Sequence, residues 1–225
     1  MKRTSRSELL RIPARGSHEW NTISRILDAG FLAHVGFSVR NQTFVIPTLY
    51  GRREERLYLH GSSASRTLRQ LEAGIPACIT VTLVDGLVLS RSAFDHSMNY
   101  RSVMAFGMAK KIVDPIEKID SLRVISEHLI PGRWAEVRGP SERELKATTV
   151  LEFFIEEISS KVRTGPPIDD ESDYGLRVWA GVLPLETRSR QPIPDEQLLD
   201  GVAPPDYLRR YDERLDGKAW RSGDQ

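Results

Sequence analysis

The sequence has little cysteine, no long apolar run and almost no excess of one charge. Its single cysteine, Cys78, cannot form a disulfide within the chain and lies in an apolar stretch, so we interpret it as a reduced, buried thiol. No stretch reaches the roughly 18 uninterrupted apolar residues of a membrane helix, and residues 1–15 lack the apolar block of a signal peptide. These absences predict a cytoplasmic protein that does not enter a membrane.

The charge balance indicates the class of ligand, and the length indicates the number of domains. Because the 32 basic and 31 acidic residues nearly cancel, no net field directs the protein towards nucleic acid, and we expect a small-molecule ligand. A chain of 225 residues suits one substantial domain with extensions. We predict a basic N-terminal arm over residues 1–16, one domain over 17–186 and a C-terminal extension, rich in proline and charge, over 187–225.

Several motifs of common enzyme classes are missing. The chain has no Gly-x-Ser-x-Gly elbow, no phosphate loop ending in Gly-Lys-Ser/Thr and no Gly-x-Gly-x-x-Gly fingerprint. No two histidines fall at the His-x-x-x-His spacing of a helical metal site, and one cysteine cannot build a thiolate cluster, so the sequence predicts no metal site. Among the histidines, His34 and His128 are interpreted as structural, whereas His60 and His96 adjoin polar segments that suit a functional site.

Short β-type segments dominate the domain. Residues 31–39 and 42–50 are rich in β-branched and aromatic residues, and Arg40-Asn41 between them predicts a hairpin turn. Asp85-Gly86, between apolar runs, is the dipeptide most typical of a two-residue hairpin, so a second turn is expected there. Further strands are predicted over residues 57–60, 100–113, 150–158 and 176–185, with 161–167 as a loop.

Helices are few. One is predicted between a Ser17 cap and Gly30, which is expected to end it in the left-handed conformation, and another over residues 63–72. Asp114-Pro115 supplies a cap and first-turn proline for a third helix, whose expected buried stripe runs from Ile116 to Leu129. Ser141 with Glu144 forms a capping box for a fourth.

Seven or eight strands joined mostly by short hairpins predict a mainly β, antiparallel barrel.

The segment Leu57–Arg66 carries the sharpest local signal. A strand there ends in a turn of small residues, and a helix follows directly. Free amides at a helix start, serine hydroxyls and the Arg66 guanidinium would all donate to a phosphate. Ordinary helix capping by Ser62 or Ser63 would explain the same turn. The pattern alone leaves both interpretations open.

Two further segments, around Pro47 and around Arg101, are candidates for contact with a ligand. Pro47 interrupts an otherwise apolar strand, and because proline cannot donate to a ladder, the strand is either an edge with a bulge or a bed for a flat ligand such as a flavin. Arg101 begins a strand whose polar and apolar residues alternate. If it faces inward it needs a carboxylate or a ligand phosphate, and if it faces outward it is an ordinary surface arginine.

Three segments in this order, Val45–Tyr50, Leu57–Arg69 and Tyr100–Gly107, resemble the FMN-binding split barrels of the pyridoxamine 5'-phosphate oxidase-like family. The likeness is greatest to its nitroimidazole-resistance branch and spans residues 20–158. Three ordered motifs are far more specific than one. The resemblance implies a split β-barrel with a few peripheral helices, a homodimer, and FMN bound in a cleft between subunits.

The resemblance also implies roles for individual residues. Ser62, Ser65 and Arg66 would hold the phosphate, the strand through Pro47 would lie along the isoalloxazine, and His60 would sit close to the flavin. The implied flavin-binding residues are Ile46, Pro47, Thr48, Leu49, Leu59, His60, Gly61, Ser62, Ser65, Arg66, Tyr100, Arg101 and Ser102. His60 is the candidate catalytic residue, because imidazole titrates near neutral pH and could donate a proton to an acceptor. A packing role for His60 stays open.

Departures from the family pattern narrow the expected activity. The oxidase pairs Ser-Arg with a following lysine, whereas this chain has Thr67, and it lacks a C-terminal Arg-x-His element. We therefore do not expect oxidation of pyridoxamine phosphate. The first hypothesis is an FMN-dependent oxidoreductase that passes electrons from NADH or NADPH to a small organic acceptor such as a nitro compound. The alternatives are a non-catalytic protein that stores, carries or senses FMN, and a barrel that holds haem or deazaflavin.

Overall fold

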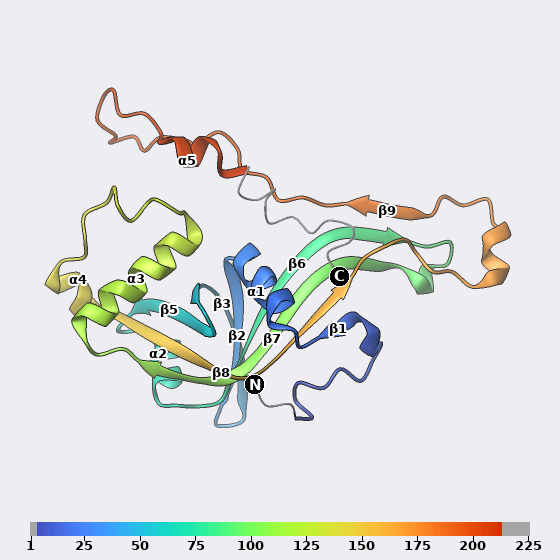
Figure 1. The fold of residues 1–225 in the computed structure, drawn as a ribbon, viewed down its shortest axis with the longest axis horizontal. Helices are drawn as coiled ribbons and strands as arrows, with labels where there is room; N and C mark the ends of the chain where they lie inside the picture. The colour runs from blue at the N-terminus through green and yellow to red at the C-terminus, as the bar shows by residue number, and fades with distance from the viewer. Residues whose placement is uncertain (1–3, 213–225) are drawn as a thin grey trace.

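A computed structural model describes residues 4–212, and within them nine strands form one antiparallel sheet (Figure 1). The strand order is β3-β2-β6-β7-β8-β5-β4, with β1 beside β8 and β9 beside β6. The strands are β1 (Gly16–Ser17), β2 (Leu32–Val39), β3 (Gln42–Leu49), β4 (Gly51–Arg53), β5 (Arg56–Ser62), β6 (Ala77–Leu89), β7 (Ser97–Lys111), β8 (Thr148–Arg163) and β9 (Gly181–Pro184). The sheet curls but does not close, which confirms the predicted mainly β split barrel.

The helices lie at the periphery of this sheet. They are α1 (Trp20–Ala29), α2 (Arg66–Glu72), α3 (Pro115–Leu129), α4 (Glu142–Ala147) and α5 (Asp206–Arg209), with 3-10 turns at Pro13–Arg15, Ala93–Asp95 and Glu171–Gly175. Helix α1 buries Ile23, Ile26 and Leu27 completely, at the i, i+3, i+4 spacing of one helix face. This face packs on the barrel core, while α3 covers a second, smaller core cluster that includes Tyr58 and Ile125.

The end of α1 departs from the prediction. Its N-cap is Glu19 instead of Ser17, and Gly30 has an extended backbone with φ −83° instead of a left-handed one. A Cβ at Gly30 would lie 2.6 Å from Val81 Cγ1, so glycine is required here by close packing on β6. The sequence pattern of a helix followed by glycine could not distinguish these two reasons.

The two predicted hairpin turns have opposite outcomes. Arg40 and Asn41 both have positive φ, at 50° and 61°, and join β2 to β3 as expected. Asp85-Gly86 does not turn, because β6 runs through it with only a bulge between Val84 and Gly86. Gly86 instead allows the last strand to approach closely, since its Cβ would lie 3.0 Å from the Leu183 carbonyl oxygen on β9.

Strand β7 and helix α3 largely follow the prediction. The register of β7 against β8 shifts at Gly107, where a Cβ would meet the Phe154 carbonyl oxygen at 1.9 Å. Asp114 caps α3 and Ser141 with Glu144 forms the capping box of α4, as predicted. Ile116 was wrongly placed in the buried stripe of α3, since it is 79% exposed. It lies in the first turn of α3, whereas the buried residues Ser121 and Ile125 lie further along the helix.

The ends of the last strands and the thiol also differ from the sequence prediction. Strand β8 continues to Arg163, into the expected loop, and β9 covers only the last part of the segment predicted as a strand.

Cys78 is half-buried on the outward side of β6, with its Sγ 3.9 Å from Thr80 Oγ1, and burial raises the pKa of the thiol. The thiol predicted to be buried is therefore only partly so.

Both terminal segments are held against the domain. Near the N-terminus, Thr4, Arg6 and Ser7 bond the carboxylate of Glu157, which is only 1% exposed on β8. The C-terminal segment runs back from β9 across the molecule to α5, above α3 (Figure 1), and Tyr211 Oη donates to the Leu129 carbonyl at 2.9 Å. None of the helices in residues 4–212 has the length and apolarity needed to cross a membrane.

Candidate functional site

Strand β5 places His60 on the side of the sheet that α3 covers. Side chains alternate along a strand, so Leu57 and Leu59 enter the barrel core, whereas Tyr58 and His60 face α3. Within residues 4–212, His60 has no hydrogen-bond partner for its buried Nδ1. Burial lowers the pKa of the imidazole below its ordinary value, so the ring is neutral at pH 7. A neutral imidazole offers a lone pair to a proton donor or to a metal ion.

The imidazole of His60 lines a cavity of about 500 Å³ between β5, α3 and α4. Its walls are mostly apolar and carry the hydrocarbon or ring surfaces of Leu122, Ile125, Leu129, Trp134 and Pro140. At its edge, Arg138 donates to both carboxylate oxygens of Glu144, at 2.8 and 2.6 Å. The apolar walls of this cavity suit a large apolar ligand.

The turn after β5 is partly occupied by its own helix cap. Ser65 Oγ accepts the Leu68 amide at 3.4 Å, Ser62 Oγ accepts the Ala64 amide at 3.1 Å, and Arg69 donates to the carbonyls of residues 63 and 64. The cap of α2 is therefore Ser65, and the interpretation that named Ser62 or Ser63 as the cap is wrong. The hydroxyl protons of both serines remain free to donate, since each oxygen only accepts in these bonds. Capping and anion binding are compatible at this turn.

Arg66 has a different environment from Arg69. Its guanidinium lies 5.4 Å above the centre of the Phe44 ring and, among the described residues, makes neither a hydrogen bond nor an ion pair. Arg66, Phe37, Phe44 and Ile46 line a second cavity of about 320 Å³ beside α2. An exposed guanidinium beside an aromatic ring has the chemistry to bind an anionic, flat molecule.

Pro47 lies in β3, at one end of the strand order. Its Cα pairs with His34 of β2, and no described strand pairs with the other edge of β3. Alternation turns Pro47 and Leu49 outward and Ile46 and Thr48 towards the barrel. The edge-strand interpretation is correct, and it leaves a row of backbone groups available to a ligand ring.

Arg101 is buried on β7 and faces a carboxylate of its own chain. Its Nε and Nη2 donate to the two oxygens of Asp85 at 2.9 and 2.6 Å. The pair lines a third cavity of about 380 Å³, to which Glu186 and Arg188 of the C-terminal segment contribute. The inward-facing alternative for Arg101 is therefore correct, and Asp85 is the carboxylate that it required.

Within this chain the predicted site residues do not converge on one cavity. His60 lines the first, Ile46 and Arg66 the second, and Arg101 the third, while the others line none of these three. Sequence reasoning missed Trp134 and Arg138, whose loop follows α3, and Asp85, which was read as a turn residue. His96 is exposed and its Nδ1 only accepts the Ser90 amide at 3.2 Å, so it is a turn residue.

The comparisons with known proteins agree with this architecture. A family model described as pyridoxamine 5'-phosphate oxidase matches residues 19–162. The flavocytochrome Anf3 from Azotobacter vinelandii is 42% identical with a TM-score of 0.86, over 92% of this chain and 96% of that one. An FAD and heme binding protein from Mycobacterium smegmatis is 34% identical with a TM-score of 0.83, over 87% and 96% of the two chains.

A more distant structure, assigned to 5-nitroimidazole antibiotic resistance in Bacteroides thetaiotaomicron, is 23% identical with a TM-score of 0.56, over 65% of this chain and 86% of that one, and shares the fold. No curated protein sequence matches. The open antiparallel sheet and these likenesses define a split barrel of the flavin-binding type. The chain belongs to the pyridoxamine 5'-phosphate oxidase-like family.

Proposed function

We propose that this protein is a redox flavoprotein that binds both a flavin and a haem and that passes electrons from NADH or NADPH to a small acceptor. The observation that carries the proposal is the partnerless His60 in a large apolar cavity. It is supported by likeness to a flavocytochrome and to an FAD and heme binding protein, which extends over most of each chain. The expectation of FMN widens accordingly to FMN or FAD.

The residues around Arg66 fit the flavin part of the proposal. The Arg66 guanidinium and the free protons of the Ser62 and Ser65 hydroxyls would hold the phosphate, and the outer edge of β3 near Pro47 would bond the ring. The second cavity has an apolar wall for the ring at Ile46 and Phe44. A bound flavin would supply hydride and single-electron transfer, and a bound haem single-electron transfer or ligand binding.

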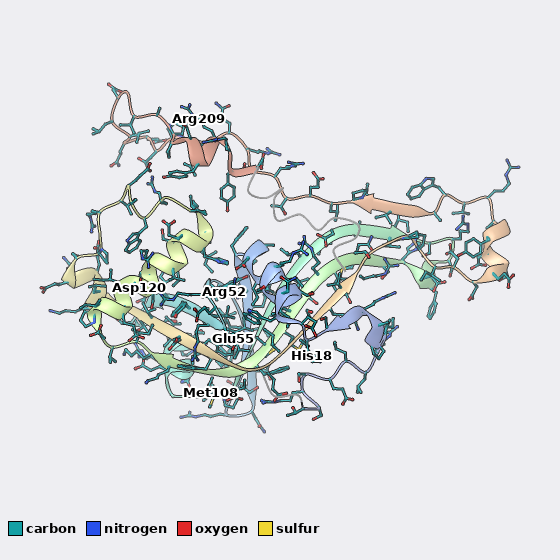
Figure 2. The ribbon with its side chains drawn as sticks, viewed as in Figure 1. His18, Arg52, Glu55, Met108, Asp120 and Arg209 are labelled. Carbon is teal, nitrogen blue, oxygen red and sulfur yellow. The ribbon has the colours of Figure 1, made fainter. Side chains whose placement is uncertain are left out.

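A homodimer is part of the proposal. The outward face of the sheet exposes apolar side chains on several adjacent strands, including Val45 at 61%, Val84 at 44% and Met104 at 43%. Met108, four residues further along β7, is 43% exposed and lies on the same face by strand alternation. Figure 2 marks its position at the lower side of the sheet. A contiguous apolar face of this kind on a soluble domain is typical of a subunit interface. Pairing two copies would also bring the separated site residues of one chain close to those of another.

The test begins with the absorption spectrum of the purified full chain. Both the blue flavin band and an intense Soret band are expected, and mass spectrometry of the released flavin decides between FMN and FAD. Oxidation of NADH and NADPH is then followed without and with a nitro compound as acceptor. A protein that takes up only one of flavin and hemin, or neither, would refute the proposal of two cofactors, and bound flavin without nicotinamide oxidation would favour the carrier alternative.

A further inference from the structure

We propose that Tyr207 of α5 is a positioning residue for the cavity between β5, α3 and α4. It holds the loop after α3 in place as one wall of that cavity, and it thereby sets the rate at which a large ligand enters and leaves. The inference rests on the proposed function, since the ligand concerned is its haem. It assigns a role to the C-terminal segment, which lies beyond the residues that the family model matches.

The loop between α3 and α4, residues 130–140, supplies part of the cavity wall through Trp134 and Arg138. On its inner side the loop is held by α3, because the Glu127 carboxylate accepts the Gly132 amide at 2.7 Å and the Trp134 amide at 2.9 Å. A segment outside regular secondary structure opens at a lower free-energy cost than a strand or helix of the core. The position of Trp134 therefore depends also on what holds the outer side of the loop.

Helix α5 holds that outer side through one side chain. Tyr207 Oη donates to the Glu136 carboxylate and accepts from Arg133 Nη1 at 3.3 Å. The tyrosine ring packs on the backbone of Gly132, which has φ +91° and whose Cβ, if present, would lie 3.5 Å from Tyr207 Cδ1. Tyr207 thus contacts the loop at positions on both sides of Trp134.

The C-terminal segment is anchored well enough to act as a support. Asp212 Oδ1 accepts the Ser189 amide at 2.6 Å and the Ser189 hydroxyl at 2.9 Å, which closes residues 189–212 into one loop. Tyr211 Oη donates to the Leu129 carbonyl at 2.9 Å, at the end of α3. Helix α5 lies within the closed loop, above α3 (Figure 1). These anchors fix α5 to the end of the helix from which the cavity loop departs.

The placement of Tyr207 separates positioning from direct contact with a ligand. Tyr207 is not one of the described residues that line the cavity, whereas Trp134 and Arg138 are. Removing its hydroxyl leaves the cavity lining intact and releases two charged groups that flank Trp134, Arg133 and Glu136. If the loop gates the cavity, entry and exit of the ligand accelerate together and the affinity changes little.

The experiment uses the full chain with flavin bound and hemin as the probe. Stopped-flow absorption measures hemin uptake, and transfer of hemin to an excess of apomyoglobin measures its release. Tyr207→Phe, which keeps the ring, is expected to raise both rates by about tenfold, because a hydrogen bond to a charged group is lost. Amide hydrogen exchange at residues 130–138 of the hemin-free protein is expected to accelerate as well, with the flavin affinity unchanged.

Two further variants test the partner and the specificity of the effect. Glu136→Gln removes the charged acceptor and should reproduce the result of Tyr207→Phe. The double variant should go little further than either single change, because both break the same bond. Tyr174→Phe, at a 55% exposed tyrosine outside the C-terminal loop, is the matched control and should behave as wild type.

The possible outcomes separate the inference from the proposed function. Wild-type hemin rates and wild-type exchange in both Tyr207→Phe and Tyr207→Ala would overturn the inference. Faster release with unchanged uptake would also overturn it, because the residue would then stabilise only the bound state. A wild type that takes up no hemin refutes the haem part of the proposed function. Hydrogen exchange then decides the positioning role by itself, since faster exchange at residues 130–138 supports it and unchanged exchange excludes it.

Discussion

Arg101 on β7 binds Asp85 on β6 through two parallel N–H donors, and this ion pair stands where the sequence suggested a hairpin turn. The pair joins adjacent strands at the bulge of β6, because Leu83 is the Cα partner of Arg101 and the register then shifts before Gly86. The arginine side chain is 8% exposed and the carboxylate 29%. The bulge therefore positions a partner for a buried cation.

We expect Asp85→Ala to destabilise the fold by about 2 kcal/mol, the scale of hydrogen bonds to a charged group, because the largely buried Arg101 loses its carboxylate. Urea unfolding measures the change. The double variant Asp85→Ala/Arg101→Met completes the cycle and should recover part of the loss, because it removes the buried charge as well. Equal stability of wild type and Asp85→Ala would show that the pair is not structural.

Arg66 gives the sharpest test of the flavin site. Loss of a hydrogen bond to a charged group costs about 1.5–3 kcal/mol, so Arg66→Ala should weaken flavin binding by about ten- to a hundredfold. Titration of the flavin-free protein, followed by fluorescence quenching, measures the affinity. Arg143→Ala, which removes an exposed arginine from α4, is the matched control and should leave the affinity unchanged. An equal affinity in Arg66→Ala would remove this residue from the site.

The exposed apolar face of the sheet leads to a prediction about the oligomeric state of the protein. Met104→Glu places a charge in the middle of the proposed dimer interface, so we expect dissociation to monomers and loss of flavin at equal protein concentration. Light scattering after size exclusion reports the mass. Ile116→Glu, at a 79% exposed position on α3 and not on the sheet, controls for the added charge. Monomeric wild type would refute the dimer.

The contacts of Glu157 lead us to expect that the N-terminal segment detaches at low pH. Hydrogen bonds from Thr4 and then from Arg6 and Ser7 lower the pKa of its carboxyl to about 2, from an ordinary 4.5. A depressed folded-state pKa contributes stability above pH 4.5 that is lost as the pH falls towards 2. Amide hydrogen exchange at residues 4–7, measured relative to the intrinsic rate at each pH, should accelerate over this interval. In Glu157→Gln it should be fast already at pH 7, and the same slow exchange in both proteins would contradict the anchoring role.

Replacing Gly107 by alanine is expected to lower the stability of the fold strongly. Because a Cβ there would lie 1.9 Å from the Phe154 carbonyl oxygen, Gly107→Ala must shift β7 against β8 at the register break. We expect a loss of about 3 kcal/mol or more, as in overpacked cores. Gly139→Ala, whose Cβ would meet nothing within 4 Å, is the control and should change stability by less than about 1 kcal/mol. Thermal unfolding of the two variants gives the comparison.

The class of fold and most of its elements follow from the amino-acid sequence alone. Local rules sufficed for the Arg40-Asn41 turn, the Asp114 cap and the Ser141–Glu144 capping box, since each depends on residues a few positions apart. The three ordered motifs identified the family because they span the strands that every member must form. The resemblance located His60 but not its surroundings.

The contacts of the distinctive residues became known from the three-dimensional arrangement of the strands and helices. Asp85-Gly86 continues a strand because Arg101 and β9 lie beside it, and Gly30 is needed because β6 approaches it, which no local pattern encodes. His60 meets a cavity built by a loop some seventy residues further along the chain. Contacts between residues distant in sequence depend on how the sheet curls and where α3 packs, so the partners of Arg101 and His60 had to be observed in three dimensions.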